Sequence, residues 1–285
     1  MAGFNLLILL NIKNIFLLLT FDPIYIAFIL FIKQIALGDK APPNDTRIVG
    51  GVTVDIENHR YQGSLQRWNR HICGVTLIST RWVLTAAHCT VVQIFDNPKV
   101  PPFHAFTVRF GSSYMQSEGF VYSVSRVIDH PSYEVFALDN DVSLLQLSRD
   151  VEISSTIEPI TLIDENQALV PGSTCTITGW GAVSFGGPAA AVLQRAFVPL
   201  ISQETCDEYY TAIYQYSVIS KNMICAGSPY GGRDACQLDS GGPLVNNGVL
   251  VGVVSWGYQC ARPQAPGVYA SVLAYRQWIR ETTGI

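Results

Sequence analysis

The chain has 285 residues, of which 48% are hydrophobic and 14% are charged, and its formal net charge at pH 7 is −4. This length can bury a sizeable core, as one large domain or two smaller ones. The sequence contains no basic run of the kind that binds nucleic acid, so we expect no nucleic-acid partner. Its seven cysteines are well separated and form no C-x-x-C pair, and the nearby histidines lack zinc-ligand spacing. This pattern favours disulfides formed in an oxidising compartment.

Residues 1–37 form an apolar leader in which polar residues interrupt the hydrophobic runs. None of these runs reaches the roughly 20 residues that a membrane-spanning helix needs. We therefore predict a signal peptide, for which Ala36-Leu37-Gly38 could provide the cleavage site. A signal anchor that holds the protein to a membrane is the alternative, and a leader wrongly joined by gene prediction is another. Residues 38–47 are polar and contain a Pro pair, which predicts a flexible connector with a glycosylation sequon at Asn44.

Strand patterns dominate the rest of the chain. Residues 72–89 alternate β-branched and apolar residues, and F-T-V-R-F-G-S (106–112) lies in a further region of strands and loops. Residues 150–171, with Pro159 and Pro171, look like a crossing between two halves. Cys175 then begins the second half.

Two further local signals follow in this second half. Asn247-Gly248 predicts a two-residue hairpin between P-L-V and V-L-V-G-V-V-S-W-G. Near the C-terminus, four large apolar residues recur at helical spacing and predict a packed terminal helix. They are Val272, Tyr275, Trp278 and Ile279.

The string D-A-C-Q-L-D-S-G-G-P-L-V (234–245) centres on Ser240, followed by two glycines that allow a tight turn and close approach to a substrate. A serine becomes a nucleophile when a base lies within hydrogen-bond reach and a third group orients that base. The chain supplies His88 in T-A-A-H-C and Asp141 in D-N-D-V-S-L-L. Taken alone, the first string could be a surface turn and Asp141 an acid entering a strand. Together, in the order His, Asp, Ser, they predict a catalytic triad.

From Ile48 to the C-terminus the sequence resembles the trypsin-like serine proteases of the chymotrypsin fold. The resemblance implies an all-β fold of two packed antiparallel six-stranded β-barrels with a C-terminal helix. The triad would lie at the junction of the barrels. It also implies a serine endopeptidase domain at residues 48–285 that works through an acyl-enzyme and needs no cofactor. Some relatives bind calcium in the loop that here begins at Ser112, but Glu118 is the only carboxylate nearby, so we expect no metal site.

The resemblance also assigns the groups around the triad. The backbone N–H groups of Leu238 and Ser240 would form the oxyanion hole. Most relatives have Gly where this chain has Leu238, and a positive φ there would strain Leu by roughly 1–2 kcal/mol. We therefore expect weakened or unusually selective catalysis. The remaining histidines, at 59, 71, 104 and 130, are interpreted as ordinary surface or structural residues.

The primary specificity pocket would have Asp234 at its floor, where a carboxylate selects Arg or Lys. Gly257 and Gly267 match the pocket walls, and the strand that contains Ser255 pairs with the substrate backbone in relatives. Ala235 removes a hydroxyl that many relatives offer to Lys, so we expect Arg to be preferred. Gln259 could narrow the entrance. Asp234 as a solvated loop acid is the alternative.

Zymogen activation is implied at the Arg47–Ile48 bond. Cleavage there would free the Ile48 ammonium to pair with the buried carboxylate of Asp239. Arg47 fits the expected specificity, so activation by the enzyme itself or by a similar one is plausible. The resemblance further implies three disulfides: Cys73–Cys89, Cys206–Cys225 and Cys236–Cys260. Cys175 is then left as a buried thiol, with an intermolecular bridge as the alternative.

The sequence therefore predicts a secreted serine endopeptidase, activated after Arg47, that cleaves after Arg or Lys. The expected partners are protein or peptide substrates, an activating protease and protein inhibitors, with the enzyme acting as a monomer. The first alternative is a catalytically weak or silent homologue that acts as a regulatory binding protein. Leu238 is the only feature of the sequence that supports this alternative. The second is a protease anchored to a membrane through residues 1–37.

Overall fold

The computed structural model describes residues 10–12, 15–17, 49–94, 97–99 and 101–285. The chain divides into two units, Met1–Asp45 and Thr46–Ile285. In the first unit, β1 (Leu10–Ile12) pairs antiparallel with β2 (Ile15–Leu17). Within the described ranges, no helix combines the length and apolar character that crossing a membrane requires. Most of the predicted leader, all of the connector, and the residues Arg47 and Ile48 lie outside the described residues.

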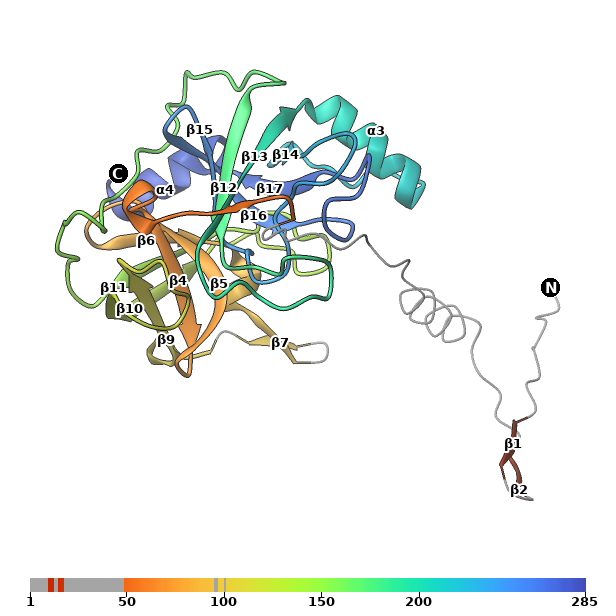
Figure 1. Ribbon diagram of the computed structural model, residues 1–285, viewed down its shortest axis with the longest axis horizontal. Helices are drawn as coiled ribbons and strands as arrows, with labels where there is room; N and C mark the ends of the chain where they lie inside the picture. The colour runs from red at the N-terminus through yellow and green to blue at the C-terminus, as the bar shows by residue number, and fades with distance from the viewer. Residues whose placement is uncertain (1–9, 13–14, 18–48, 95–96, 100) are drawn as a thin grey trace. The chain divides into compact units, whose positions relative to one another are not determined.

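The first barrel of the second unit is closed by six antiparallel strands in the order β10-β11-β6-β5-β4-β9 (Figure 1). Alternation explains why these segments form strands: in β9, Phe106, Val108 and Phe110 are buried while Thr107 and Arg109 are partly exposed. The strands are β4 (Gln62–Arg67), β5 (Arg70–Leu77), β6 (Trp82–Thr85), β9 (Phe106–Phe110), β10 (Phe120–Asp129) and β11 (Ser143–Leu147).

The second barrel also has six strands, because the sheet β12-β15-β16-β17-β14-β13 closes through a β12–β13 pairing. A short strand, β3 (Val52–Thr53), extends this sheet by pairing with Gln194 and Arg195 of β13. The six strands are β12 (Thr174–Gly179), β13 (Gln194–Ile201), β14 (Met223–Ala226), β15 (Pro243–Asn246), β16 (Val249–Trp256) and β17 (Gly267–Ser271). The predicted fold of two antiparallel six-stranded barrels is confirmed.

The hairpin between β15 and β16 turns as predicted. Asn247 has φ 48° and Gly248 has φ 81°, and Asn246 faces Val249 across the turn. Two consecutive positive φ values match the right-handed twist of the strands, and Asn-Gly adopts them at low cost.

Residues 148–173 connect β11 to β12 and contain no strand. The Ile160 N–H donates to the Leu77 carbonyl of the first barrel, and the Ile163 N–H donates to the Leu250 carbonyl of the second. The C-terminal helix forms as predicted, as η3 (Val272–Tyr275) followed by α4 (Arg276–Thr283). His130, just beyond β10, contacts Tyr275 and Trp278 with ring centroids 5.3 and 5.0 Å apart.

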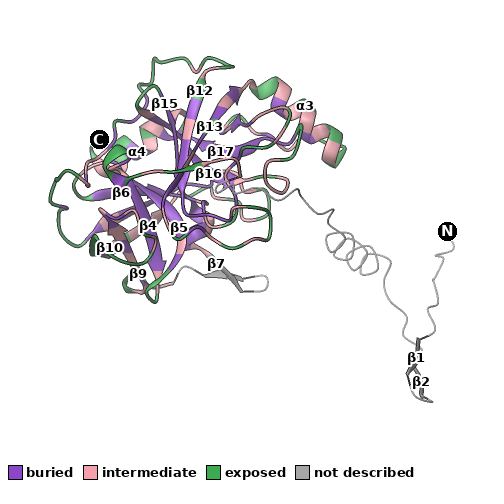
Figure 2. Cartoon of the chain, in the orientation of Figure 1, coloured by how far each residue is buried: buried purple, intermediate pink, exposed green. Residues whose placement is uncertain are grey.

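The longest helix of the described residues was not predicted from the sequence. Helix α3 (Gln203–Tyr214) begins after Ser202, whose hydroxyl accepts a hydrogen bond from the Thr205 N–H at 3.1 Å. Only Cys206 and Tyr210 are fully buried on this helix, and its other residues are intermediate or exposed (Figure 2). The remaining short elements are η1 (Ile56–Asn58), α2 (Ala87–Thr90), β7 (Val92–Ile94), β8 (Asn97–Lys99) and η2 (Phe103–Ala105).

Candidate active site

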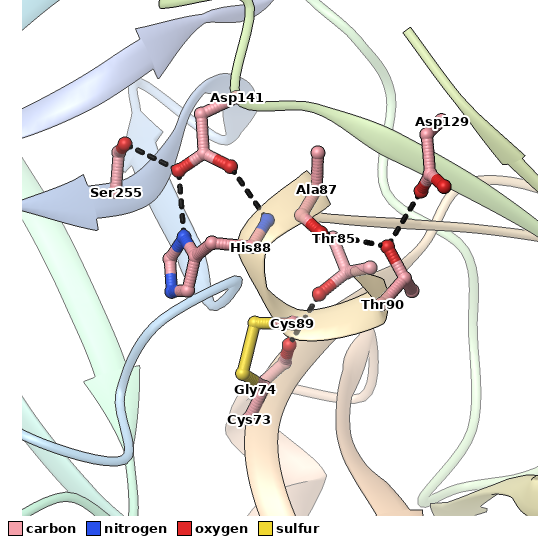
Figure 3. Close-up of polar contacts among 10 residues, drawn as sticks. All are labelled: Cys73, Gly74, Thr85, Ala87, His88, Cys89, Thr90, Asp129, Asp141 and Ser255. Atoms are coloured by element: carbon pink, nitrogen blue, oxygen red, sulfur yellow. Dashed lines mark hydrogen bonds and ion pairs between the residues drawn. A yellow bond between two sulfur atoms is a disulfide. The ribbon is translucent and has the colours of Figure 1, made fainter. Parts of the chain in front are cut away.

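His88 and Asp141 meet in the first barrel (Figure 3). Asp141 is 1% exposed, and its Oδ2 lies 2.7 Å from His88 Nδ1. Its Oδ1 accepts the His88 backbone N–H at 2.9 Å, and Oδ2 also accepts the Ser255 hydroxyl at 2.5 Å. An ionised carboxylate only accepts, so Nδ1 carries the proton and Nε2 is left as a base. Asp141 therefore fixes both the tautomer and the orientation of the imidazole.

The turn at Ser240 is held against the His88 segment by several contacts. The Gly74 N–H donates to the Ser240 carbonyl at 2.8 Å, and the Cys73–Cys89 disulfide joins the neighbours of Gly74 and His88. Gly241 has φ 78°, and a Cβ there would lie 2.2 Å from Thr85 Oγ1. Only glycine fits this position. The structure thus brings together the two motifs that the sequence supplies from different barrels.

Leu238 adopts φ 75°, the left-handed conformation that makes a leucine strained. Its carbonyl accepts a hydrogen bond from His71 Nε2 at 3.0 Å, and His71 Nδ1 lies 2.8 Å from Ser64 Oγ. Because a carbonyl only accepts, Nε2 carries the proton and Nδ1 accepts from the Ser64 hydroxyl. Burial lowers the pKa of His71 and keeps the ring neutral. His71, expected to be an ordinary surface or structural histidine, is a buried structural one, and its side chain fixes the Leu238 peptide.

Asp239 is 1% exposed. Its carboxylate accepts the Gly181 N–H at 2.7 Å and the Cys236 N–H at 3.0 Å. Burial raises its pKa from 3.8 to about 7, since these hydrogen bonds offset only part of the desolvation. Gly179 and Gly181 make room for the carboxylate, because a Cβ at either would lie within 2.2 Å of it.

A cavity of about 160 Å³ opens beside Ser240. Asp234, Ser255, Gly257 and Gly267 all line it. Asp234 is 2% exposed, and its Oδ2 accepts the Ala261 N–H at 3.0 Å. Its Oδ1 is buried without a hydrogen-bond partner in the described part of the chain, and burial raises its pKa to about 7.

The two glycines of this cavity act differently. A Cβ at Gly267 would lie 2.7 Å from Asp234 Oδ1, so a side chain there would displace the carboxylate. A Cβ at Gly257 would meet nothing closer than 3.6 Å, so this glycine keeps space open. The cavity therefore contains a carboxylate oxygen, Asp234 Oδ1, without a hydrogen-bond partner among the described residues, which suits a cation.

Comparison with known proteins agrees with this geometry. The family model for Trypsin matches residues 48–279. The chain belongs to the trypsin family. It is a serine endopeptidase that acts on protein substrates.

Three curated relatives in this trypsin family come from insects. The chain is 41% identical over 240 residues to a vitellin-degrading protease of Bombyx mori, covering 84% of this chain and 87% of the relative. It is 39% identical to a trypsin of Phaedon cochleariae, with 84% and 89% covered, and 39% identical to trypsin 5G1 of Aedes aegypti, with 84% and 86% covered.

The trypsin domain contains the three disulfides that the resemblance implies: Cys73–Cys89, Cys206–Cys225 and Cys236–Cys260. Cys175 is a buried free thiol that faces Asn246 in the β12–β15 pair, with Asn246 Nδ2 3.5 Å from its sulfur. Desolvation raises the pKa of this thiol, which lowers its reactivity. Among the described residues, Cys73, His88 and Cys89 place potential metal ligands together, but both sulfurs belong to the disulfide.

Tyr210 is a further residue that the sequence analysis missed. Its hydroxyl donates to the Pro266 carbonyl at 2.7 Å and accepts the Tyr258 N–H at 3.2 Å. Both partners flank the pocket glycines, so Tyr210 supports the pocket wall from helix α3. The spacing of four residues between Cys206 and Tyr210, which places both on one face of a helix, could have predicted that Tyr210 is buried.

Proposed function

We propose that this trypsin-family protease cleaves after Arg and, less well, after Lys. The observation that supports this specificity is the Oδ1 of Asp234, which lies in the cavity beside Ser240 without a hydrogen-bond partner among the described residues. A buried carboxylate without a partner is costly, and a guanidinium offers a fork of donors that satisfies it. Arg is favoured over Lys because Ala235 offers no hydroxyl to a shorter ammonium.

In the proposed mechanism, Ser240 Oγ attacks the scissile carbonyl while His88 Nε2 accepts the proton and later gives it to the leaving amine. Asp141 stabilises the imidazolium that forms. The N–H groups of Leu238 and Ser240 bind the oxyanion, and each such donor is typically worth about 3 kcal/mol. Water then hydrolyses the acyl-enzyme by the same route.

We further propose that the enzyme is secreted as a zymogen and acts as a monomer. The three disulfides support passage through an oxidising compartment. Cleavage after Arg47, by another protease or by the enzyme itself, would release the Ile48 ammonium. The buried carboxylate of Asp239, with its raised pKa, supports a cation as its partner in the active form. Protein inhibitors would bind across the same pocket.

The test uses the full chain expressed in a secretory host. After cleavage following Arg47, the active fraction is titrated with a covalent serine-directed reagent and turnover is measured on chromogenic Arg, Lys and Phe substrates. Stoichiometric labelling at Ser240 with selective turnover of the Arg substrate is expected. Absent labelling despite a free Ile48 terminus would favour a silent regulatory homologue, and Leu238 would be the first residue to examine.

The secreted material also tests the leader. N-terminal sequencing that finds residues 1–37 removed supports a signal peptide. Retention of these residues on membranes would favour the anchored form.

A further inference from the structure

The turn that carries His88 is short and has few hydrogen bonds of its own. Helix α2 has four residues, and the Val91 N–H donates to the Ala87 carbonyl at 2.9 Å to close its single turn. Its N-cap residue is Ala86, which makes no side-chain hydrogen bond to the first N–H groups. Contacts from outside the helix must therefore hold this turn in place. Asp141 supplies such contacts to the backbone N–H and to the ring of His88.

Asp129 supplies a further contact from a different strand (Figure 3). It is the last residue of β10, and its carboxyl oxygen Oδ1 lies 2.5 Å from the Thr90 hydroxyl oxygen. Thr90 is the last residue of helix α2, and the same hydroxyl lies 2.9 Å from the Ala87 carbonyl oxygen, to which it can donate. One hydroxyl therefore joins β10 to the residue immediately before His88.

Asp129 also belongs to a row of polar residues that crosses three neighbouring strands. Its partner in β11 is Ser143, and the partner of Ser143 in β6 is Thr85. Both hydroxyl residues are fully buried, and the Thr85 hydroxyl donates to the Gly74 carbonyl at 3.0 Å. Gly74 in turn donates its N–H to the Ser240 carbonyl. Apolar residues are the usual occupants of a barrel interior, so packing of the core does not require this polar row.

The number of available protons explains why a carboxyl group suits this position. A carbonyl only accepts, and the Thr90 hydroxyl has a single proton to give. Both bonds of Thr90 can therefore form together when Asp129 carries a proton and donates it to the Thr90 oxygen. Burial raises the pKa of Asp129 above its ordinary value, and the charge of Asp141 adds to this rise. Hydrogen bonds from Thr90 and Ser143 offset only part of the effect on the pKa.

We propose that Asp129 is a positioning residue for the catalytic triad, and that it acts through the Thr90 hydroxyl on the turn that carries His88. The inference rests on the proposed function, because it requires His88 to act as the base for Ser240. Asp129 does not line the primary pocket, so its removal should slow the chemical step without weakening substrate binding. A small displacement of a catalytic group is enough to lower the rate, since the reaction depends on close alignment of the reacting atoms.

The test measures kcat and KM of the activated full chain on an Arg nitroanilide, with the active fraction titrated by a covalent serine-directed reagent. Asp129→Val and Thr90→Val each remove the link between β10 and helix α2. In both variants kcat should fall about three- to tenfold, which corresponds to the loss of one hydrogen bond, and KM should change by less than about twofold. Asp129→Asn, whose amide can donate to Thr90, and Thr90→Ser, which keeps the hydroxyl, should restore most of kcat.

A double variant that carries Asp129→Val and Thr90→Val tests the proposed route. If Asp129 acts through Thr90, the double variant should lose no more kcat than either single variant. Losses that multiply would show that the two residues act separately and would overturn the proposal, as would a kcat within about 1.5-fold of the parent in both single variants. Asp150→Val is the matched control, because Asp150 is an exposed acid that follows β11 of the same barrel, and it should leave kcat unchanged.

The proposed function can fail separately. If Ser240 is not labelled and no Arg substrate is cleaved, proton NMR on the full chain carrying Ser240→Ala still observes the His88 Nδ1 proton in its hydrogen bond to Asp141. The chemical shift of this proton should change when Asp129→Val is added and should return to the parent value with Asp129→Asn. A chemical shift that is the same in all three chains would reject Asp129 as a positioning residue.

Discussion

Replacing the pocket acid by its neutral isostere, Asp234→Asn, should change activity and stability in opposite directions. Asn keeps an acceptor for the Ala261 N–H but cannot carry charge. A bound Arg would then lose its buried ionic partner. Removing one partner of a buried charge pair typically costs about 2–5 kcal/mol. We expect kcat/KM on Arg substrates to fall by a factor of roughly 30 to 5,000, with little change on Phe substrates.

The expected stability gain follows from the pKa of the same carboxyl. Burial raises this pKa from 3.8 to about 7, so the folded chain binds the proton more tightly than the unfolded chain. Stability contributed by the proton is present at low pH and is lost as the pH rises from about 4 to about 7. The shift of about three units corresponds to roughly 4 kcal/mol. The Asn variant should therefore be more stable than the parent at pH 8 by up to about 4 kcal/mol. At pH 5 this gain in stability should be about 3 kcal/mol smaller.

Urea unfolding at pH 5 and pH 8 measures this difference. Both chains should carry Ser240→Ala so that self-cleavage does not interfere. Glu152→Gln, at an exposed acid, is the control and should show no such pH-dependent gain. Retention of Arg cleavage within threefold would refute Asp234 as the specificity group. A stability difference that does not change between the two pH values would refute the electrostatic account of its burial.

Three further predictions concern single sites. Benzamidine, a planar amidinium, should bind about tenfold more weakly for each pH unit below about 7, because protonation of Asp234 competes with the cation. An affinity, measured by calorimetry, that does not change between pH 5 and 7 would contradict this. Leu238→Gly should raise activity toward small substrates and add roughly 1–2 kcal/mol of stability by removing the strain at φ 75°, and no gain would show that the peptide is already well formed. Asn246→Cys should form a disulfide with Cys175 across the β12–β15 pair and stabilise the fold by about 2–4 kcal/mol, and a persistent free thiol in labelling experiments would disprove it.

Short sequence motifs were sufficient for most of the active-site prediction. His88, Asp141 and Ser240 lie in short segments whose neighbours indicate a role, and the Asn-Gly turn requires only two residues. Asp234 could be placed because the position six residues before Ser240 is fixed within one loop. These features depend on nearby sequence, which is why they could be read before the fold was known.

Features that depend on contacts between residues distant in the sequence could not be predicted from such motifs. His71 has no motif around it, and its role arises from contact with Leu238, 167 residues later. The ring contact between Tyr214 and Tyr258 joins helix α3 to the loop after β16. Helix α3 itself was missed because only Cys206 and Tyr210 face the interior, which leaves little hydrophobic periodicity.

Each end of the second unit contacts the barrel that lies farther from it in the sequence. Strand β3 precedes the first barrel in sequence but pairs with β13 of the second, and the C-terminal helix follows the second barrel but contacts His130 next to β10. Neither barrel can therefore unfold without disturbing the other. We expect a single cooperative unfolding transition in calorimetry, together with slow folding, because these contacts close only after most of the chain has been synthesised. A nick that detaches either end would loosen both halves, which makes the termini points of vulnerability to other proteases.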